Sequence, residues 1–131
     1  MRYSGKHAPI VAVDFDGTIT TTKTLHDFDM DTPPRDNCHR TLQTLHIAGC
    51  QLILWTCREG EHLQQAVDYL RKWDLPIYRY NENVENLDWE CRKVYADYYV
   101  DDLAYDKEDI NWWHVWRNIT KHPYFHKSEG A

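Results

Sequence analysis

The sequence predicts an α/β fold in which helices alternate with the strands of a mainly parallel sheet. Two short runs, Ile-Val-Ala-Val at residues 10–13 and Leu-Ile-Leu-Trp at residues 52–55, are apolar at every position. Such runs are typical of strands that are covered on both faces. Segments with apolar residues at helical spacing follow both runs, and this alternation indicates parallel strands joined by right-handed crossovers.

The first half of the chain contains the two strands and one helix. A polar stretch, residues 20–35, follows the first strand and is rich in Thr and Asp. We expect it to form a loop or small hairpin beside the strand end, where it could act as a flap. The helix predicted over 35–48 is indicated by apolar residues at helical spacing and by a terminating glycine: Cys38, Leu42, Leu45 and Gly49.

The second half begins with another amphipathic helix, which ends at Leu75-Pro76. Its stripe consists of Leu63, Ala66, Val67 and Leu70. Short strands are predicted at residues 77–80 and 98–100. A last helix, packed on the sheet, is indicated by the stripe Trp112, Trp113, Trp116 and Ile119. We expect the polar tail, residues 121–131, to fray.

Length and composition favour one globular domain, residues 1–131, with a cytoplasmic location. The chain has six tryptophans and a formal charge of −6, which argues against a general nucleic-acid-binding protein. No run is long and apolar enough to be a signal peptide or a membrane span. The cysteines lack metal-site spacing and are expected to be reduced thiols: Cys38, Cys50, Cys57 and Cys91. No histidine is assigned to catalysis.

Polar side chains follow three of the predicted strands. Asp14 and Asp16 come after the first, Thr56 after the second, and an acidic pair after the strand at 98–100. The carboxyl ends of parallel strands lie at one edge of the sheet, which is where ligands bind in open α/β sheets. Several carboxylates at one edge repel one another unless a cation neutralises them, and oxygen ligands favour Mg²⁺.

These residues resemble the four motifs of the haloacid dehalogenase-like hydrolases. Asp14-Phe15-Asp16-Gly17-Thr18 is similar to the first motif, DxDGT, and Thr56 at the end of an apolar strand is similar to the second. Lys93 matches the third motif, and Asp101-Asp102 matches the acidic fourth. The resemblance implies a Rossmann-like three-layer sandwich and a magnesium-dependent phosphatase.

The resemblance also implies a role for each matched residue. Asp14 would be the nucleophile that forms an aspartyl-phosphate, and Asp16 the acid and base, with its main-chain carbonyl on the metal. Thr56 and Lys93 would donate to the transferring phosphoryl oxygens. The candidate phosphate-binding residues are Gly17, Thr18, Cys57 and Arg58. The candidate metal ligands are Asp14, Asp16, Asp101 and Asp102.

Three assignments keep an alternative. Asp102 is the expected direct metal ligand and Asp101 a water-mediated partner, but a solvated turn also explains an isolated acidic pair. Arg92 is the alternative to Lys93. Arg58 could bind a substrate phosphate through its two-pronged guanidinium, or form a surface ion pair with a nearby glutamate, either Glu59 or Glu61.

The spacing of the motifs leaves no room for a cap domain. The interval from Asp14 to Thr56 holds one loop and one helix, so the chain resembles the capless branch, whose site is open or is covered by a neighbouring subunit in a homo-oligomer. The expected substrate is a small phosphomonoester such as a nucleotide, and polynucleotide ends and phosphoproteins stay among the alternatives. A module that binds a phosphorylated ligand without turnover is the competing hypothesis.

Overall fold

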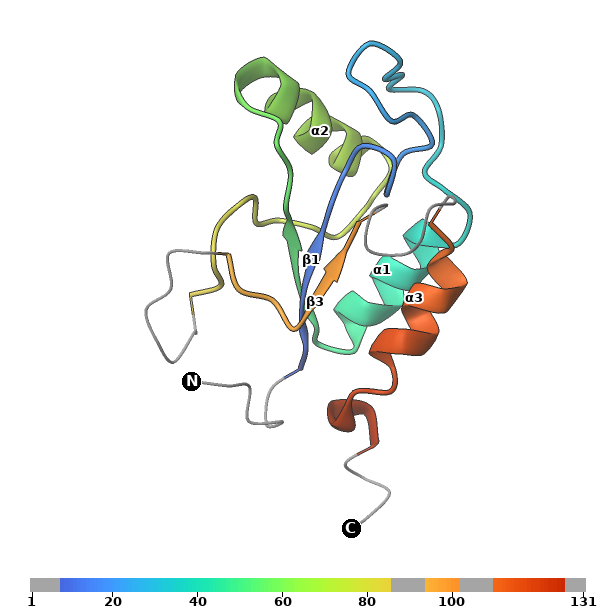
Figure 1. Cartoon of the computed structure of the whole chain (residues 1–131), viewed down its shortest axis with the longest axis vertical. Coiled ribbons are helices and arrows are strands. Elements are labelled where there is room, and N and C mark those ends of the chain that lie inside the picture. Colours follow the sequence, from blue (N-terminus) through green and yellow to red (C-terminus); the bar gives the residue numbers. More distant parts are fainter. Residues whose placement is uncertain (1–7, 86–93, 102–109, 127–131) are drawn as a thin grey trace.

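The centre of the structure is a parallel β-sheet. The computed structural model describes residues 8–85, 94–101 and 110–126, which contain the strands β1 (Ile10–Val13), β2 (Gln51–Leu54) and β3 (Tyr98–Val100). The strand order is β2-β1-β3, with β1 in the middle (Figure 1). Both pairings are parallel. The predicted α/β class and parallel sheet are therefore confirmed.

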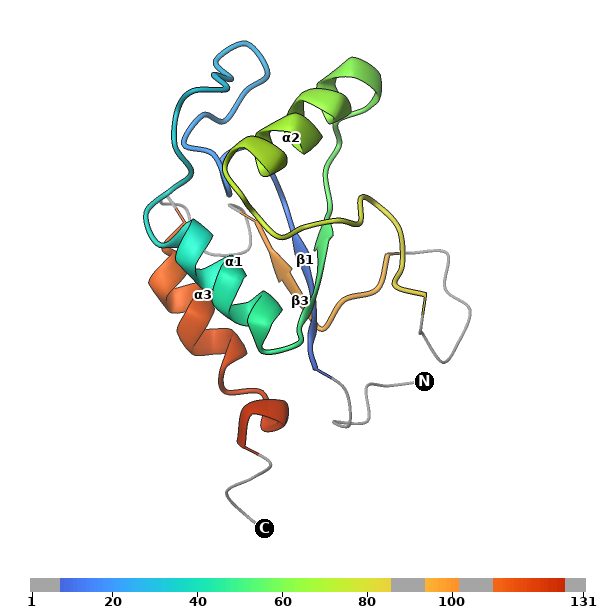
Figure 2. The same ribbon diagram turned by 180° about the vertical axis from the view of Figure 1, so that it is seen from behind.

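The helices of the described residues are α1 (Cys38–Ile47), α2 (Gly60–Lys72), α3 (Trp112–Ile119) and the 3-10 helix η1 (Pro123–His126). Figures 1 and 2 show α1 and α3 side by side, whereas α2 lies nearer the end at which the strands terminate. None of these helices has the length and apolar character that crossing a membrane requires.

Helix α1 begins at Cys38, later than the predicted start at residue 35. The main-chain N–H of Arg35 donates to the carbonyl of Ile19 (2.9 Å), and Asn37 has a φ of 67°. A residue in the left-handed region cannot be part of a right-handed helix, so α1 cannot extend further back. At the other end Gly49 has a φ of 100°, which glycine adopts at low cost, and the predicted stop is confirmed.

The prediction of a strand at residues 77–80 is wrong. Only one bridge forms there, between Leu54 and Tyr80. Hydrogen bonds join the main chain of Leu54 to the carbonyl of Arg79 (2.8 Å) and to the N–H of Asn81 (2.7 Å). Asn81 then adopts a φ of 52°, which turns the chain away from β2 and ends the pairing.

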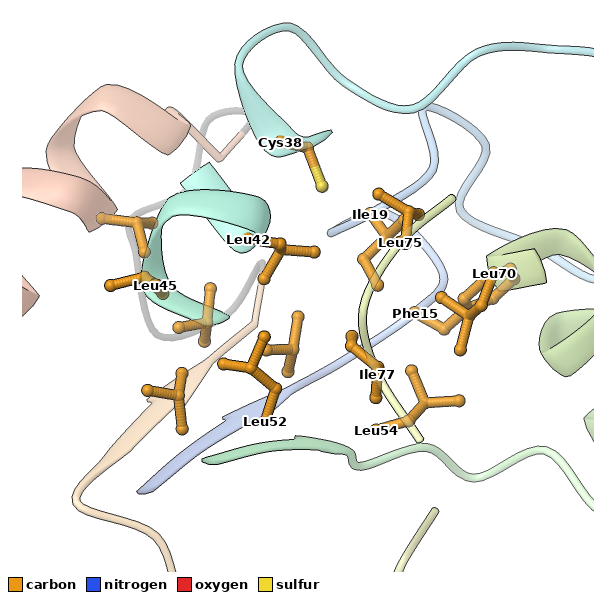
Figure 3. Close-up of a cluster of buried hydrophobic side chains, with 14 of the residues drawn as sticks. Phe15, Ile19, Cys38, Leu42, Leu45, Leu52, Leu54, Leu70, Leu75 and Ile77 are labelled. Carbon is orange, nitrogen blue, oxygen red and sulfur yellow. The ribbon is translucent and has the colours of Figure 1, made fainter. Parts of the chain in front are cut away.

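One face of the sheet packs against all three α-helices. The buried cluster on this face joins alternate strand residues to side chains of α1, α2 and α3 (Figure 3). Its members include Val11, Val13, Leu52, Leu54, Leu42, Leu45, Ala66, Leu70, Val115 and Ile119. The alternation follows from the two-residue period of strands, and burial of this apolar surface stabilises the fold.

The opposite face carries a smaller cluster. Ile10, Ala12 and Ile53 pack there against Val84 and Ala96, which lie outside the helices and strands. Within the described residues this face is therefore covered by irregular segments, and all three α-helices contribute to the other face. The described residues thus comprise a parallel sheet with one layer of helices.

The C-terminal region corrects two expectations. Trp112, Val115 and Ile119 form the buried stripe of α3, whereas Trp113 is 54% exposed, because adjacent residues on a helix lie about 100° apart. The tail was expected to fray from residue 121, but residues up to His126 are ordered and include η1. The phenol of Tyr124 donates to the carbonyl of Ala48 (2.8 Å), which attaches this segment to the end of α1.

The cysteines of the described residues are free thiols. Cys38 and Cys50 are buried and Cys57 is exposed, while Cys91 lies outside the described residues. Burial raises the pKa of Cys38 and raises that of Cys50 to about 12. The two buried cysteines therefore act as small apolar side chains.

Candidate functional site

The candidate site begins where β1 ends. The main-chain N–H of Asp14 donates to the carbonyl of Val100 (2.9 Å), and that of Trp55 donates to the carbonyl of Val13 (2.8 Å). Hydrogen bonding between the strands thus continues one residue beyond β1 on the β3 side and one residue beyond β2 on the other side. Because Val13 is paired with Val100, the next residues, Asp14 and Asp101, lie level at the carboxyl edge of the sheet.

A tight turn follows Asp14. Gly17 has a φ of 76°, and its N–H donates to the carbonyl of Thr22 (2.8 Å). The left-handed conformation favours glycine at this position. Thr18 is fully buried, and its carbonyl accepts the indole N–H of Trp112 (2.9 Å). Gly17 and Thr18, which were predicted to bind phosphate, thus fix the path of the chain beside the two aspartates.

The end of β2 supplies Thr56, which is held by an asparagine far along the chain. The side chain of Asn81 accepts the main-chain N–H of Thr56 (2.8 Å) and donates to the carbonyl of Thr56 (3.0 Å). The hydroxyl oxygen of Thr56 in turn accepts the main-chain N–H of Arg58 (3.1 Å). Thr56 therefore sits in a defined position at the same edge as Asp14. Sequence reasoning missed Asn81.

Arg58 forms a two-pronged ion pair with Asp16. Its Nε donates to Oδ2 of Asp16 (2.8 Å), and its Nη2 donates to Oδ1 (2.7 Å). Arg58 is only 4% exposed. The sequence offered a substrate phosphate or a neighbouring glutamate, Glu59 or Glu61, as its partner. The ion pair that the structure records for Arg58 is instead with Asp16.

Residues 20–35 form a loop whose ends are close together. The Nε of Arg35 donates to the carbonyls of Gly17 (3.1 Å) and Thr20 (3.0 Å), at the opposite end of the loop. The loop has turns and bends but no strand, so it is not the small hairpin that was the alternative. In Figure 1 it stands at the carboxyl end of the sheet, next to α2.

Helix α2 anchors this loop. The phenol of Tyr69 donates to the carbonyl of Thr32 (2.7 Å), and the indole of Trp73 donates to the carbonyl of Met30 (3.0 Å). Burial, followed by the nearby Cys38 and Asp29, raises the pKa of Tyr69, so its hydroxyl stays protonated as a donor. Side chains of α2 and of Trp73, which directly follows it, thus hold the main chain of the loop, in addition to the contact between the loop's own ends.

The proposed metal ligands are described only in part. Asp102 and the expected phosphate-binding Lys93 lie outside the described residues. In the part of the chain that the structure describes, no group of three or more His, Cys, Asp or Glu side chains could hold a metal ion. The candidate ligands among the described residues are the carboxylates of Asp14 and Asp101 and the main-chain carbonyl of Asp16. All of these ligand atoms are oxygens, which fits Mg²⁺ chemistry. Cys57, predicted to bind phosphate, has an exposed free thiol.

Comparison with known proteins identifies one similar structure. No protein-family model matches the chain, and no curated protein matches it. Among solved structures, a conserved protein from Bacteroides thetaiotaomicron is 30% identical, with a TM-score of 0.70. The match covers 88% of this chain and 92% of that one.

The chain belongs to the family of this conserved Bacteroides protein. Because the match covers most of both chains, the two proteins share the fold across nearly their full length. A shared fold does not establish an activity, so the function is argued from the site itself.

Proposed function

We propose that this protein is a magnesium-dependent phosphomonoester hydrolase of the haloacid dehalogenase-like type. The observation that carries the proposal is the position of Asp14, half-buried directly after the central strand and level with Asp101 at the carboxyl edge. In open α/β sheets this edge is where ligands bind. The proposal includes the fold expected for this type of hydrolase, a three-layer sandwich without a cap domain.

In the proposed reaction Asp14 is the nucleophile. One of its carboxylate oxygens attacks phosphorus, and the bond from phosphorus to the leaving oxygen breaks, so that an aspartyl-phosphate forms. Asp16 gives a proton to the leaving oxygen. Asp16 then takes a proton from the water that attacks the aspartyl-phosphate, which releases inorganic phosphate and restores Asp14.

Other residues of the site would stabilise the transferring group. The hydroxyl of Thr56 and the ammonium of Lys93 would donate to the phosphoryl oxygens, and loss of one such donor commonly costs ~3 kcal/mol. Asp14, the main-chain carbonyl of Asp16, and Asp101 or Asp102 would hold Mg²⁺, which offsets the negative charge of the phosphate.

The substrate we propose is a small phosphomonoester, with nucleotides as the first class to test. The formal charge of −6 weighs against long polynucleotides, although their ends are included in the test. The interval between Asp14 and Thr56 contains the loop at 20–35 and α1, which is consistent with a capless site. Residues of this loop would then contribute to substrate selection.

The test is phosphate release from a panel of nucleotides, sugar phosphates, phosphopeptides and oligonucleotide ends. We expect turnover that requires Mg²⁺, is lost on chelation, and returns when the metal is restored. Absence of metal-dependent turnover with every member of the panel would refute the proposal.

One observation favours a second candidate, a module that binds a phosphorylated ligand without turnover. Both carboxylate oxygens of Asp16, the proposed acid and base, accept hydrogen bonds from Arg58 in the structure. Calorimetry with a non-hydrolysable phosphonate distinguishes the two. Binding without turnover of the matching phosphate ester would support the module, whereas turnover of that ester would refute it.

A further inference from the structure

The guanidinium of Arg58 is enclosed by acceptors from two parts of the fold. Besides its two bonds to Asp16, its Nη1 donates to the carbonyl of His62 (2.9 Å) and to Oε1 of Gln65 (3.5 Å), both in α2. Its side chain is 2% exposed, whereas that of Asp16 is 21% exposed. The carboxylate therefore reaches the solvent-facing side of the site, and the arginine lies behind it.

Two aromatic rings complete this enclosure. The Cζ of Arg58 lies 4.9 Å from the ring centre of Phe15 and 4.8 Å from that of Phe28. Such contacts are favourable for a cation, and more so when it is removed from water. Phe15 belongs to the turn between the two aspartates, while Phe28 belongs to the loop at 20–35. Both rings also contact Tyr69 of α2, so the arrangement connects the turn, the loop and the helix.

We propose that Arg58 is a positioning residue for Asp16 and not a ligand of the substrate phosphate. To reach a substrate, its side chain would have to give up buried hydrogen bonds to Asp16 and His62, and a buried group left without its partner costs about 1–3 kcal/mol. Where it stands, the planar guanidinium holds both oxygens of the carboxylate and fixes its plane. Phe28 supports Arg58, so the loop at 20–35 contributes to the position of Asp16.

This inference rests on the proposed hydrolase function and adds a dependence on the leaving group. An alkyl phosphate needs a proton on its leaving oxygen, whereas para-nitrophenolate leaves without one. A change that disorients Asp16 should therefore lower kcat/KM, which reports formation of the aspartyl-phosphate, far more for the first ester than for the second. A change that weakens binding of the phosphate should impair both equally, because the phosphoryl group is the same.

The experiment compares phenethyl phosphate with para-nitrophenyl phosphate in the wild type and in Arg58→Lys, which keeps the charge but loses the two-pronged contact. We expect kcat/KM for phenethyl phosphate to fall at least about tenfold with KM nearly unchanged, since general acid catalysis contributes about 10²–10⁴-fold. For para-nitrophenyl phosphate we expect a fall of less than about threefold. Asp16→Asn should give the same substrate pattern, and the double variant should show little further loss.

Two further variants make the test decisive. Phe28→Leu should give the same substrate pattern with a smaller fall in kcat/KM. It serves as the test variant if Arg58→Lys does not fold. Arg71→Lys is the matched control, because Arg71, which lies in α2, also stacks on a ring (Tyr78, 4.2 Å) and also donates to a carbonyl (Leu75, 2.9 Å), but away from the site. We expect wild-type kinetics from it.

Three outcomes would overturn the positioning role of Arg58. They are equal losses of kcat/KM for the two esters, a rise in KM alone, and no loss in Arg58→Lys or Phe28→Leu. These outcomes are separate from failure of the proposed function, which would appear as a wild-type protein that turns over neither ester.

Discussion

The two edges of the sheet carry acidic residues in different surroundings. At the amino edge, Oδ2 of Asp97 accepts the main-chain N–H of Ile10 (2.7 Å), and Oδ1 accepts the phenol of Tyr95 (3.0 Å). The N–H of Asp97 also donates to the carbonyl of Ile10 (2.7 Å). This carboxylate therefore completes the hydrogen bonding of β1 where β3 has not yet begun.

At the carboxyl edge the main chain completes the pairing, through the bond from Asp14 to the carbonyl of Val100. The side chains of Asp14 and Asp101 are not needed for that purpose, and Asp16 is held by Arg58. The comparison teaches that an aspartate beside a strand has a structural role when it replaces a missing ladder partner. Where the main chain already completes the ladder, strand pairing does not require the carboxylate.

The largest expected effect is that of Asp14→Asn at the carboxyl edge. Loss of the nucleophile should lower kcat by at least about 10³-fold, since removing a reacting group commonly has effects of that size or larger. The melting temperature should stay close to that of the wild type. The measurement is phosphate release with Mg²⁺, alongside a thermal melt. A variant with more than a tenth of wild-type activity would contradict the assignment of Asp14.

Asn81→Ala should have the next largest effect on turnover. It removes both hydrogen bonds that hold the peptide of Thr56, each worth about 0.5–1.5 kcal/mol, so kcat/KM should fall by about tenfold. Steady-state kinetics with a single ester measures this change. Asn83→Ala is the control. Asn83 is near Asn81 in the sequence, but its side chain accepts the main-chain N–H of Tyr95 and not that of Thr56. Equal losses in the two variants would argue against a specific role for Asn81.

Asp97→Asn at the amino edge should change stability and not chemistry. The amide keeps one acceptor oxygen where the carboxylate has two, so we expect the free energy of unfolding to fall by about 1–2 kcal/mol. Activity per folded molecule should be unchanged. Urea denaturation and active-site-normalised kinetics test the two statements. A loss of kcat in Asp97→Asn without a loss of stability would contradict a purely structural role for the aspartate at the amino edge.

The smallest effect concerns Cys50, which immediately precedes β2 at the amino edge. Burial, followed by the charge of Asp97, raises its pKa from its ordinary value of 9.0 to about 12. Between these values the unfolded chain loses a proton that the folded chain keeps, so the free energy of unfolding falls as pH rises above about 9. Cys38 adds a slope of the same sign. Urea denaturation from pH 7 to 10.5 should show a shallower fall in Cys50→Ala, and an unchanged slope would contradict the burial of this thiol.

The parallel sheet and the placement of Asp14 could be predicted because both depend on local patterns. Successive apolar residues indicate buried strands, and parallel strands bring their carboxyl ends to one edge. Gly17 was predicted as a phosphate-binding residue, and in the structure it adopts the left-handed conformation that glycine tolerates at low cost. The predicted roles of Lys93 and Asp102 stay predictions, because these residues lie outside the described part of the chain.

Long-range partners were not predictable. Arg58 pairs with a residue 42 positions away, while the sequence offered a substrate phosphate or a neighbouring glutamate as its partner. Asn81 reaches Thr56 because it directly follows the bridge between Tyr80 and Leu54 at the end of β2, and nothing local to residue 81 predicts that contact. Trp113 was misplaced because adjacent residues lie about 100° apart on a helix, and in α3 only Trp112 of this pair is buried.

The most direct test of the central claim is to trap the covalent intermediate. The protein is mixed with a phosphomonoester that it turns over and Mg²⁺, quenched in acid within a single turnover, digested, and analysed by mass spectrometry. The account predicts a phosphoryl group on the side chain of Asp14, absent in Asp14→Asn and in samples without metal. Turnover that proceeds with no phosphorylated Asp14, or with the phosphoryl group on another residue, would contradict it.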